Sequence, residues 1–366
     1  MLSTLRMSAS RRLSQLAGQT RNASTMKEAV VGKGTKVTIQ DVPIPKAGPH
    51  QVVTKVVFSG SNPKDWKRAE MPNQPAKNQG DDISGVVHEV GDNVSEFKPG
   101  DRVMAFHEMM NPGGSYAEYA LSWEHTTAHL PENMSFEEGA AIPLASLTAA
   151  IGLFARLRLP EPWLPATKPT PLIIYGAASA VGSYAIQLAQ RANIHPLICV
   201  AGKSRDHIEK YISREKGDTI IDYRKGPDAI VAAFQKVAQQ HGKIEYAFDA
   251  VSEKGSYQNI CKVLSTDGGR ITNVLPGRKY DVPEGVVQSL TTVGRVHGVP
   301  DDLKDFGYVY FRYFAKGLQE GWFKPQPQEV RPGVLEGIQE ALVSRKEGEA
   351  KAVKYVSRIE DTPGVG

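Results

Sequence analysis

The stretch YGAASAVG, residues 175–182, decides how this chain folds. It closes the short apolar run PLIIYG (171–176) and opens AVGSYAIQLAQRA (180–192), which has helical spacing. Small residues at such a turn let the backbone approach a pyrophosphate, and the start of the following helix presents unpaired N–H groups to it. Gly176 suits the tight turn, and Gly182 allows the helix to pack closely on the strand. We therefore expect a dinucleotide to bind where this strand passes into its helix.

The same alternation of short apolar runs and helical segments continues downstream. Strands that alternate with helices of this length form parallel βαβ units, and continuous apolar runs fit strands covered on both faces. The pattern predicts an α/β fold with a Rossmann-type, doubly wound parallel sheet. Further strands are expected at 196–202, 219–223, 244–251, 268–275 and 291–299, and helices at 204–217 and 230–242.

The residues after the second of these strands indicate which dinucleotide binds. Sites for NAD usually carry Asp or Glu there for the ribose 2′-hydroxyl. This chain reads Ala201-Gly202-Lys203-Ser204-Arg205, so two cations and a hydroxyl replace the carboxylate. Such groups suit a 2′-phosphate dianion, and the sequence therefore predicts NADPH. The alternative is that Lys203 and Arg205 only decorate an exposed helix start, where cations would oppose the helix dipole.

The first half of the chain has a different pattern. Short, β-branched runs are separated by Gly, Pro and Asn turns, which predicts an antiparallel, barrel-like domain. Residues 136–157 then show helical spacing, broken once at Pro143. Near the end of the chain, a helix expected at 334–348 precedes a strand at 352–359 that could return to the first domain. The runs expected as barrel strands are 52–60, 83–91, 101–108 and 116–123.

Length and composition agree with two globular domains. The chain has 366 residues, too many for one ordinary core. Its only cysteines are Cys199 and Cys261, which excludes a disulfide framework and a four-cysteine zinc site. The apolar segment 140–159 contains Pro143 and Arg156, so we expect a buried helix there and no membrane span.

The net charge of +4 comes from the first 25 residues, which hold four arginines and no acid. Without those four, 40 of the 44 basic residues remain against 40 acidic residues, so the balance gives no reason to expect nucleic-acid binding. Residues 1–25 are also rich in serine, which is typical of a mitochondrial transit peptide. A mitochondrial matrix location follows if that interpretation holds. If the segment is a disordered tail, or if translation starts at Met26, the location is cytoplasmic.

Several motifs in order resemble the medium-chain dehydrogenase/reductase superfamily, in particular its zinc-free quinone oxidoreductase and enoyl reductase branch. Besides the turn at 175–182, these are MKEAVV (26–31), SGSNPKDW (59–66), GDDISGVVHEVGDNVSEFKPGDRV (80–103), GGSYAEY (113–119) and LPENMSFEEGAAIPLASLTA (130–149). Within this branch the chain is similar to fungal reductases of the quinone-reductase and trans-acting enoyl reductase kind. The resemblance implies a GroES-like β-barrel domain at 26–146 and 321–366, with a Rossmann NADPH-binding domain at 147–320.

The resemblance also implies cofactor contacts at matching positions. Asn62 would lie near the nicotinamide and Thr148 near the hinge between domains. Ala178, Ser179, Ala180 and Val181 would hold the pyrophosphate together with Gly176 and Gly182. Ser179 stands where glycine is usual, and its hydroxyl could donate to a phosphate. Lys203, Ser204 and Tyr223 would face the 2′-phosphate.

The chain departs from the zinc alcohol dehydrogenases where those enzymes carry their catalytic ligands. A cysteine and a Gly-His-Glu motif are replaced by Ser59-Gly60-Ser61-Asn62 and Gly80-Asp81-Asp82. His125 and His129 could share a helical face but lack a third ligand, so no metal is expected. The sequence does not identify a catalytic acid. Solvent, Ser61, Tyr116 or Tyr119 could deliver a proton, and each of these side chains is equally explained as structural.

Three functions remain open on these grounds. The first is an NADPH-dependent, zinc-free oxidoreductase that transfers hydride to a quinone or a conjugated enone as its small-molecule electron acceptor. The second is a trans-acting enoyl reductase that works on carrier-bound acyl chains. The third is a nucleotide-binding redox sensor without turnover. A homodimer is possible in each case.

Overall fold

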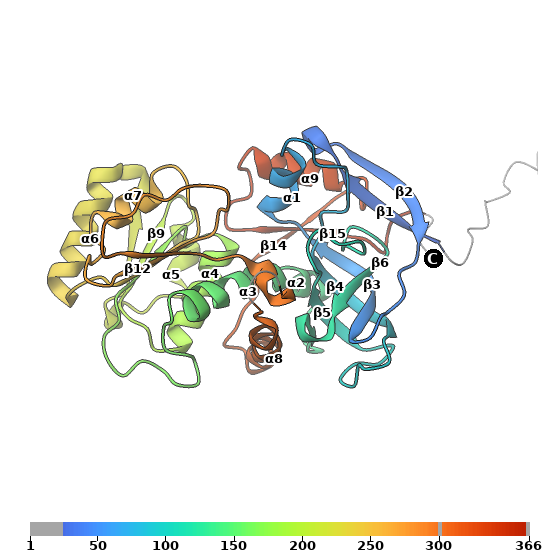
Figure 1. Cartoon of the computed structure of the whole chain (residues 1–366), viewed down its shortest axis with the longest axis horizontal. Helices are drawn as coiled ribbons and strands as arrows, with labels where there is room; N and C mark the ends of the chain where they lie inside the picture. The colour runs from blue at the N-terminus through green and yellow to red at the C-terminus, as the bar shows by residue number, and fades with distance from the viewer. Residues whose placement is uncertain (1–24, 299–301, 364–366) are drawn as a thin grey trace, which may run out of the picture.

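The computed structural model describes residues 25–298 and 302–363, and half of this part is built on a six-stranded parallel sheet (Figure 1). The strand β8 lies inside the sheet, with β9 and β10 on one side and β11 to β13 on the other. The strand order therefore reverses at β8, as in a doubly wound Rossmann sheet. The strands in spatial order are β10 (Thr219–Asp222), β9 (Leu197–Ala201), β8 (Leu172–Tyr175), β11 (Tyr246–Asp249), β12 (Arg270–Asn273) and β13 (Val287–Leu290).

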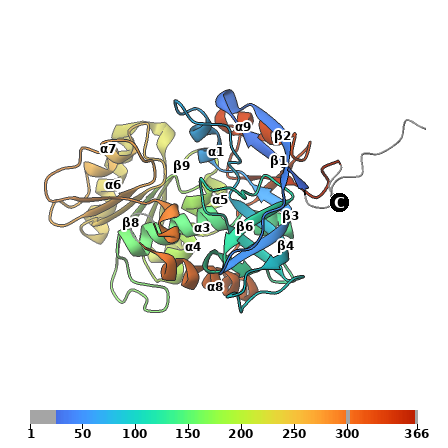
Figure 2. The same cartoon turned by 45° about the vertical axis from the view of Figure 1, so that its right-hand side comes forward.

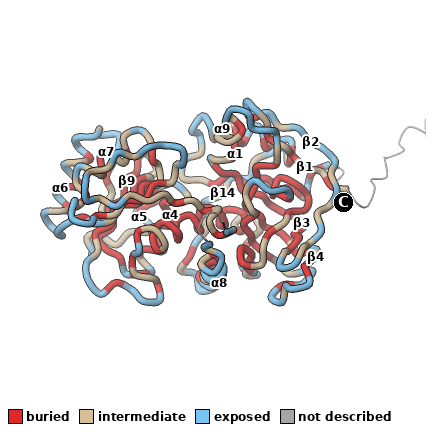
Figure 3. Tube along the Cα trace, viewed as in Figure 1, coloured by how far each residue is buried: buried red, intermediate tan, exposed pale blue. Residues whose placement is uncertain are grey.

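The two faces of β8 belong to separate apolar cores, which explains its continuous apolar run. Leu172 and Ile174 pack with side chains of α4 (Ala180–Arg191). Ile173 and Tyr175 pack with α6 (Pro227–His241) and α7 (Ser256–Cys261) on the opposite face. The inner strands β8, β9, β11 and β12 are among the most buried parts of the molecule (Figure 3), whereas the edge strands β10 and β13 are more exposed. The predicted α/β fold with helices on both faces is confirmed.

The other half of the molecule is the barrel-like domain that the sequence predicted. Its strand β15 pairs antiparallel with β3, which confirms the expected return of the C-terminal strand. The helix α1 (Pro63–Ala69) interrupts the run of strands, where no helix was expected, and packs against α9 (Ile338–Lys346). The barrel strands are β14 (Gln328–Arg331), β15 (Lys354–Arg358), β3 (Gln51–Gly60), β4 (Asp82–Val90), β5 (Arg102–Phe106) and β7 (Thr127–His129), with β6 (Tyr119–Trp123) beside β3 and a hairpin of β1 (Thr25–Val31) and β2 (Val37–Pro43).

Two helices join the halves near the middle of the molecule (Figure 2). Beyond α2 (Phe136–Ala140), the helix α3 (Pro143–Ala150) packs against α4 of the Rossmann half and against β4 and β5 of the barrel. The helix α8 (Lys304–Glu320) packs against β7, and its Arg312 pairs with Glu96 of a barrel loop. The domain bounds 26–146, 147–320 and 321–366 themselves remain a prediction.

Two local predictions were wrong. The helix expected at 204–217 is limited to α5 (Arg205–Glu209), because the carboxylate of Asp218 accepts hydrogen bonds from the backbone of Ser213 and Leu197 and turns the chain into β10. The strand expected at 291–299 is a 3-10 helix, Val293–His297. Its buried residues Val293 and Val296 are three apart, which matches the 3-10 period and not the alternation of a strand.

Residues 1–24 lie outside the described part of the chain, so the prediction of a transit peptide or disordered tail is not tested. The strand β1 begins at Thr25, one residue before the predicted boundary. In residues 25–298 and 302–363, every helix is too short or too polar to cross a bilayer. The segment 140–159 instead forms the buried helix α3 and a π-helical continuation, Ile151–Arg156.

Candidate active site

The turn between β8 and α4 has the shape of a phosphate cradle. Gly176 adopts a left-handed conformation with φ 80°. A Cβ atom on Gly182 would lie 2.4 Å from the carbonyl oxygen of Gly176, so only glycine fits between helix and strand. Ser179 caps the helix, since its hydroxyl oxygen accepts a hydrogen bond of 3.0 Å from the backbone N–H of Gly182. That oxygen is thus engaged in the cap, and the hydroxyl hydrogen is left to reach a phosphate.

The backbone of this turn is accessible to a ligand. Ser179 is exposed, and the neighbouring residues Ala178, Ala180 and Val181 are partly exposed. The helix α4 that follows has 12 residues and directs its N-terminal N–H groups toward this turn. A missing side chain at Gly182 and exposed small residues beside a helix start fit a pyrophosphate, because the anion can approach the N–H groups directly.

The end of β9 lies beside this turn and carries the residues predicted for the 2′-phosphate. Lys203 is exposed, and Ser204 occupies the N-cap position of the short helix α5. The ring of Tyr223 lies over Gly202, because a Cβ there would come within 2.6 Å of the ring. Tyr223 is 51% exposed. The structure thus brings Lys203, Ser204 and Tyr223 to one edge of the sheet.

A carboxylate does lie near this edge, although the pattern at 201–205 contains none. Asp222 ends β10 and is paired in register with Ala201 of β9. Its carboxylate accepts hydrogen bonds from the backbone N–H and the guanidinium of Arg224. These bonds to Arg224 hold the pKa of Asp222 well below its ordinary value. The acid is therefore already neutralised by a cation of its own loop.

Asn62, predicted to lie near the nicotinamide, belongs to a buried polar group at the barrel end of α3. Its side-chain Nδ2 donates a hydrogen bond of 2.7 Å to Asp82, and its Oδ1 accepts one of 2.7 Å from Lys354. Lys354 and Asp82 form an ion pair of 2.6 Å. Burial lowers the pKa of Lys354 below its ordinary value, although the charge of Asp82 opposes this shift.

Thr148 is connected to this group through the helix α3. The carboxylate of Asp82 accepts a hydrogen bond of 2.7 Å from the backbone N–H of Leu144, in the first turn of α3. One turn later, the Thr148 hydroxyl donates to the carbonyl oxygen of Leu144. The helix also packs on α4, whose Tyr184 donates to the backbone of Ala141 just before it. The helix that carries Thr148 therefore contacts both Asp82, which holds Asn62, and α4, which follows the phosphate turn.

Asp81, at a position where the zinc dehydrogenases carry a ligand, is bound by neighbouring side chains. Its carboxylate forms an ion pair with Lys64 and lies 2.9 Å from Nδ1 of His107. Burial opposes the charge of Asp81, but Lys64 and His107 outweigh it and lower its pKa. Within residues 25–298 and 302–363, no group of three His, Cys, Asp or Glu side chains is arranged to hold a metal ion.

The three side chains suggested as proton donors are not brought together. The Tyr116 hydroxyl donates a hydrogen bond of 2.7 Å to Asp65, and burial together with that carboxylate raises the pKa of Tyr116 well above its ordinary value. Tyr119 is buried and its ring packs against His88. Ser61, next to Asn62, donates to the backbone of Tyr355. Of the three, only Ser61 adjoins a predicted cofactor contact.

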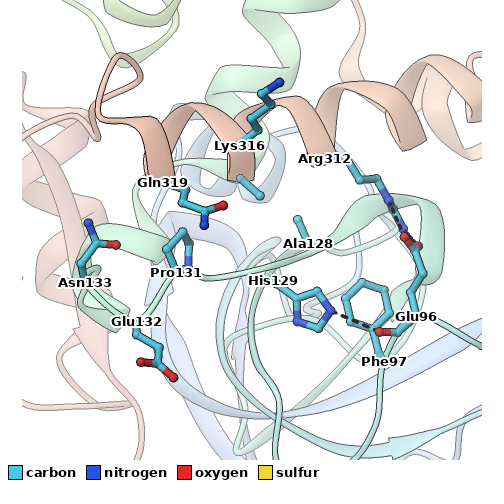
Figure 4. A pocket seen from close by; sticks show the side chains of 11 residues that line it. Glu96, Phe97, Ala128, His129, Pro131, Glu132, Asn133, Arg312, Lys316 and Gln319 are labelled. Carbon is cyan, nitrogen blue, oxygen red and sulfur yellow. Dashed lines mark hydrogen bonds and ion pairs between the residues drawn. The ribbon is translucent and has the colours of Figure 1, made fainter.

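A surface pocket of about 640 Å³ lies elsewhere, between α8 and the barrel (Figure 4). It contains none of the predicted cofactor contacts. His129 lines it, and its Nε2 lies 3.1 Å from the backbone oxygen of Glu96. Arg312 and Glu96 form their ion pair at its edge. The ion pair between Arg312 and Glu96 thus holds α8 to the barrel beside this pocket.

Sequence reasoning named Asp82 only for the absence of a zinc ligand and did not consider Lys354. A signal for Lys354 was present, because it is a charged residue within the otherwise apolar strand AVKYV. The partner could not be read from that pattern, since Asp82 and Asn62 lie more than 250 residues earlier in the chain.

Comparisons with known proteins agree with this architecture. Residues 48–132 match the alcohol dehydrogenase GroES-like domain. The chain is similar in fold to an alcohol dehydrogenase superfamily protein from Novosphingobium aromaticivorans (TM-score 0.75, 22% identity, 92% of this chain and 100% of that chain). It is also similar in fold to a quinone oxidoreductase from Pseudomonas syringae (TM-score 0.71, 20% identity, 91% and 99%).

Two fungal relatives carry the comparison further. The trans-enoyl reductase pvhC of Talaromyces variabilis is 29% identical over 86% of this chain and 92% of its own length. The trans-enoyl reductase fsr4 of Gibberella fujikuroi is 56% identical over 88% of this chain and 95% of its own length. The chain is therefore a member of the trans-enoyl reductase family, within the medium-chain dehydrogenase/reductase superfamily.

Proposed function

We propose that this protein is an NADPH-dependent, zinc-free enoyl reductase that acts on acyl chains bound to a carrier and supplied in trans by a synthase. This is the second of the three functions that the sequence left open. The proposal for the substrate rests on the similarity to fungal trans-enoyl reductases. The proposal for the cofactor rests on the residues around the end of β9.

The observation that carries the cofactor proposal is the pairing of a phosphate cradle with a cationic strand end. Gly176 and Gly182 leave room for a pyrophosphate at the start of α4. Lys203 and Ser204 offer a cation and a hydroxyl where an NAD site would need a carboxylate. The nearby Asp222 is held by Arg224 and is not free to accept from a ribose hydroxyl. A 2′-phosphate suits these charges better than a 2′-hydroxyl.

When bound, NADPH would supply a hydride to the β-carbon of the enoyl thioester while a proton joins the α-carbon, so that the double bond becomes a single bond. The chain's own residues would act by position. The turn at 176–182 would hold the pyrophosphate, Lys203, Ser204 and Tyr223 the 2′-phosphate, and Asn62 and Thr148 the nicotinamide end. The proton would come from solvent or from a polar side chain such as Ser61.

Zinc is not needed in this proposal. Reduction of a conjugated double bond demands less charge stabilisation from the protein than reduction of an isolated carbonyl, which profits from a Lewis acid. At the zinc positions, Asn62 and Asp82 are bonded to Lys354, and Asp81 to Lys64 and His107. Both cations there are ammonium groups, which would repel a metal ion.

The test is a panel of acceptors offered to the purified full chain. Oxidation of NADPH is followed by absorbance with an enoyl thioester of pantetheine, a conjugated enone and a quinone, and each assay is repeated with NADH. We expect turnover with NADPH and the enoyl thioester. Turnover with quinones or enones alone would identify the first alternative, a quinone or enone reductase. Tight binding of NADPH without turnover on any acceptor would identify the third, a redox sensor.

A further inference from the structure

A carboxylate and an ammonium group are buried side by side where the barrel meets α3. Asp82 has no exposed surface, and Lys354 is 2% exposed. They come from β4 and β15, which flank β3 on its two sides. Burying either charge alone would be strongly unfavourable, whereas together they form a neutral pair. The two charges therefore depend on each other.

Asp82 connects three separate parts of the chain. One carboxylate oxygen accepts from both Asn62 Nδ2 and Lys354 Nζ, at 2.7 and 2.6 Å. The other accepts from the backbone N–H of Leu144, at 2.7 Å, and so caps the start of α3. Because α3 also carries Thr148, this single carboxylate sets the positions of both residues predicted to lie at the nicotinamide end.

The pair also fixes which way the amide of Asn62 points. The ammonium of Lys354 can only donate a hydrogen bond and the ionised carboxylate of Asp82 can only accept one. The amide oxygen must therefore face Lys354, and the amide nitrogen must face Asp82. The nitrogen carries two hydrogens and Asp82 takes one of them. The direction of the second N–H is thereby fixed as well.

We propose that Asp82 and Lys354 are positioning residues that orient Asn62 for the nicotinamide and, as a neutral pair, balance the affinities for the reduced and the oxidised cofactor. The inference rests on the proposed NADPH-dependent function. The nicotinamide ring gains one positive charge when it gives up a hydride. A net charge left beside it by removal of one partner must therefore change the two affinities unequally.

The other charged groups near the pair are the same in every variant. The guanidinium of Arg345 on α9 and the carboxylate of Asp65 on α1 both act on Lys354. Asp65 is also paired with Lys64, 2.9 Å away. A change confined to position 82 or 354 therefore alters the local charge by one unit while these neighbours remain.

The experiment compares dissociation constants for NADPH and NADP⁺, measured by fluorescence or calorimetric titration of the full chain. Lys354→Met leaves the carboxylate and should shift the ratio of the two constants by about fivefold or more in favour of NADP⁺. Asp82→Asn leaves the ammonium and should shift the ratio by a similar factor in favour of NADPH. The double variant, with neither charge, should return the ratio to that of the wild type.

A further variant covers the case in which a single buried charge prevents folding. Asn62→Ala keeps both charges and removes the amide that they orient, so the ion pair should still form. It should weaken the binding of NADPH and NADP⁺ by about fivefold each. Unchanged binding in this variant, or ratios that stay at the wild-type value in folded Lys354→Met or Asp82→Asn, would overturn the inference. Failure of the wild-type protein to bind either nucleotide would instead overturn the proposed function.

Discussion

Replacing Gly182 by alanine tests the phosphate cradle at its tightest point. A Cβ atom there would lie 2.4 Å from the carbonyl oxygen of Gly176 and 2.7 Å from the Cα of Ala177. Ordinary van der Waals contact begins at 3.4 Å, so the turn and the start of α4 must separate by about 1 Å (3.4 − 2.4). Both atoms belong to the backbone, and a side-chain rotation therefore cannot relieve the clash.

Two quantities should change. Overpacking of this kind costs about 1–3 kcal/mol, of which alanine in a helix recovers about 0.5–1 kcal/mol relative to glycine. We expect the melting temperature to fall by roughly 2–6 °C. A displacement of about 1 Å breaks a hydrogen bond to phosphate, which is worth about 1.5–3 kcal/mol when the acceptor is charged. The dissociation constant of the dinucleotide should rise roughly 10- to 100-fold.

The assay combines thermal unfolding with fluorescence titration of NADPH and NADH. Because NADPH and NADH share the pyrophosphate, the affinity for both should fall by the same factor. Gly32→Ala is the matched control, since a Cβ at that position would meet its nearest neighbour, the Cβ of Ala76, at 3.4 Å. Unchanged binding and an unchanged melting temperature in Gly182→Ala would refute the assignment of this turn to the cofactor.

Three further expectations concern charge and metal. Lys203→Glu should weaken the binding of NADPH about tenfold or more and that of NADH hardly at all. Lys210→Glu, on the same exposed segment, should leave the binding of both nucleotides unchanged. An equal loss of NADPH and NADH binding in Lys203→Glu would speak against the 2′-phosphate assignment. Hydrogen bonding by Arg312 lowers the pKa of Glu96. The ion pair between the two residues therefore stabilises the fold near neutral pH, and this contribution is lost as the pH falls through the lowered pKa. Glu96→Gln should therefore reduce stability at pH 7 by no more than about 1 kcal/mol, because the carboxylate is partly exposed, and this loss should shrink as the pH falls below the ordinary pKa of a glutamate. A loss that stays constant over the whole acidic range in chemical denaturation would contradict this. Chelator treatment should leave activity unchanged, and one zinc ion per chain, measured by elemental analysis, would exclude the zinc-free mechanism.

Local features of the sequence were enough to predict both halves of the fold and the phosphate turn. The continuous apolar run at 171–176, which is buried on both faces, identifies β8 without reference to any distant residue. The glycines at 176 and 182 are required by a backbone conformation and a close approach within eight residues of chain. Patterns of this range are set by periodicity and turn chemistry, which act between near neighbours.

Tertiary structure alone decided the contacts between distant segments. The group of Asn62, Asp82 and Lys354 exists because β15 returns to pair with β3 after the Rossmann sheet is complete. The same holds for Asp222, whose pairing with Arg224 is local but whose place beside Ala201 follows from the register of two strands. Strand pairing over such distances depends on how whole elements pack, and the residues themselves carry no short-range signal of their partners.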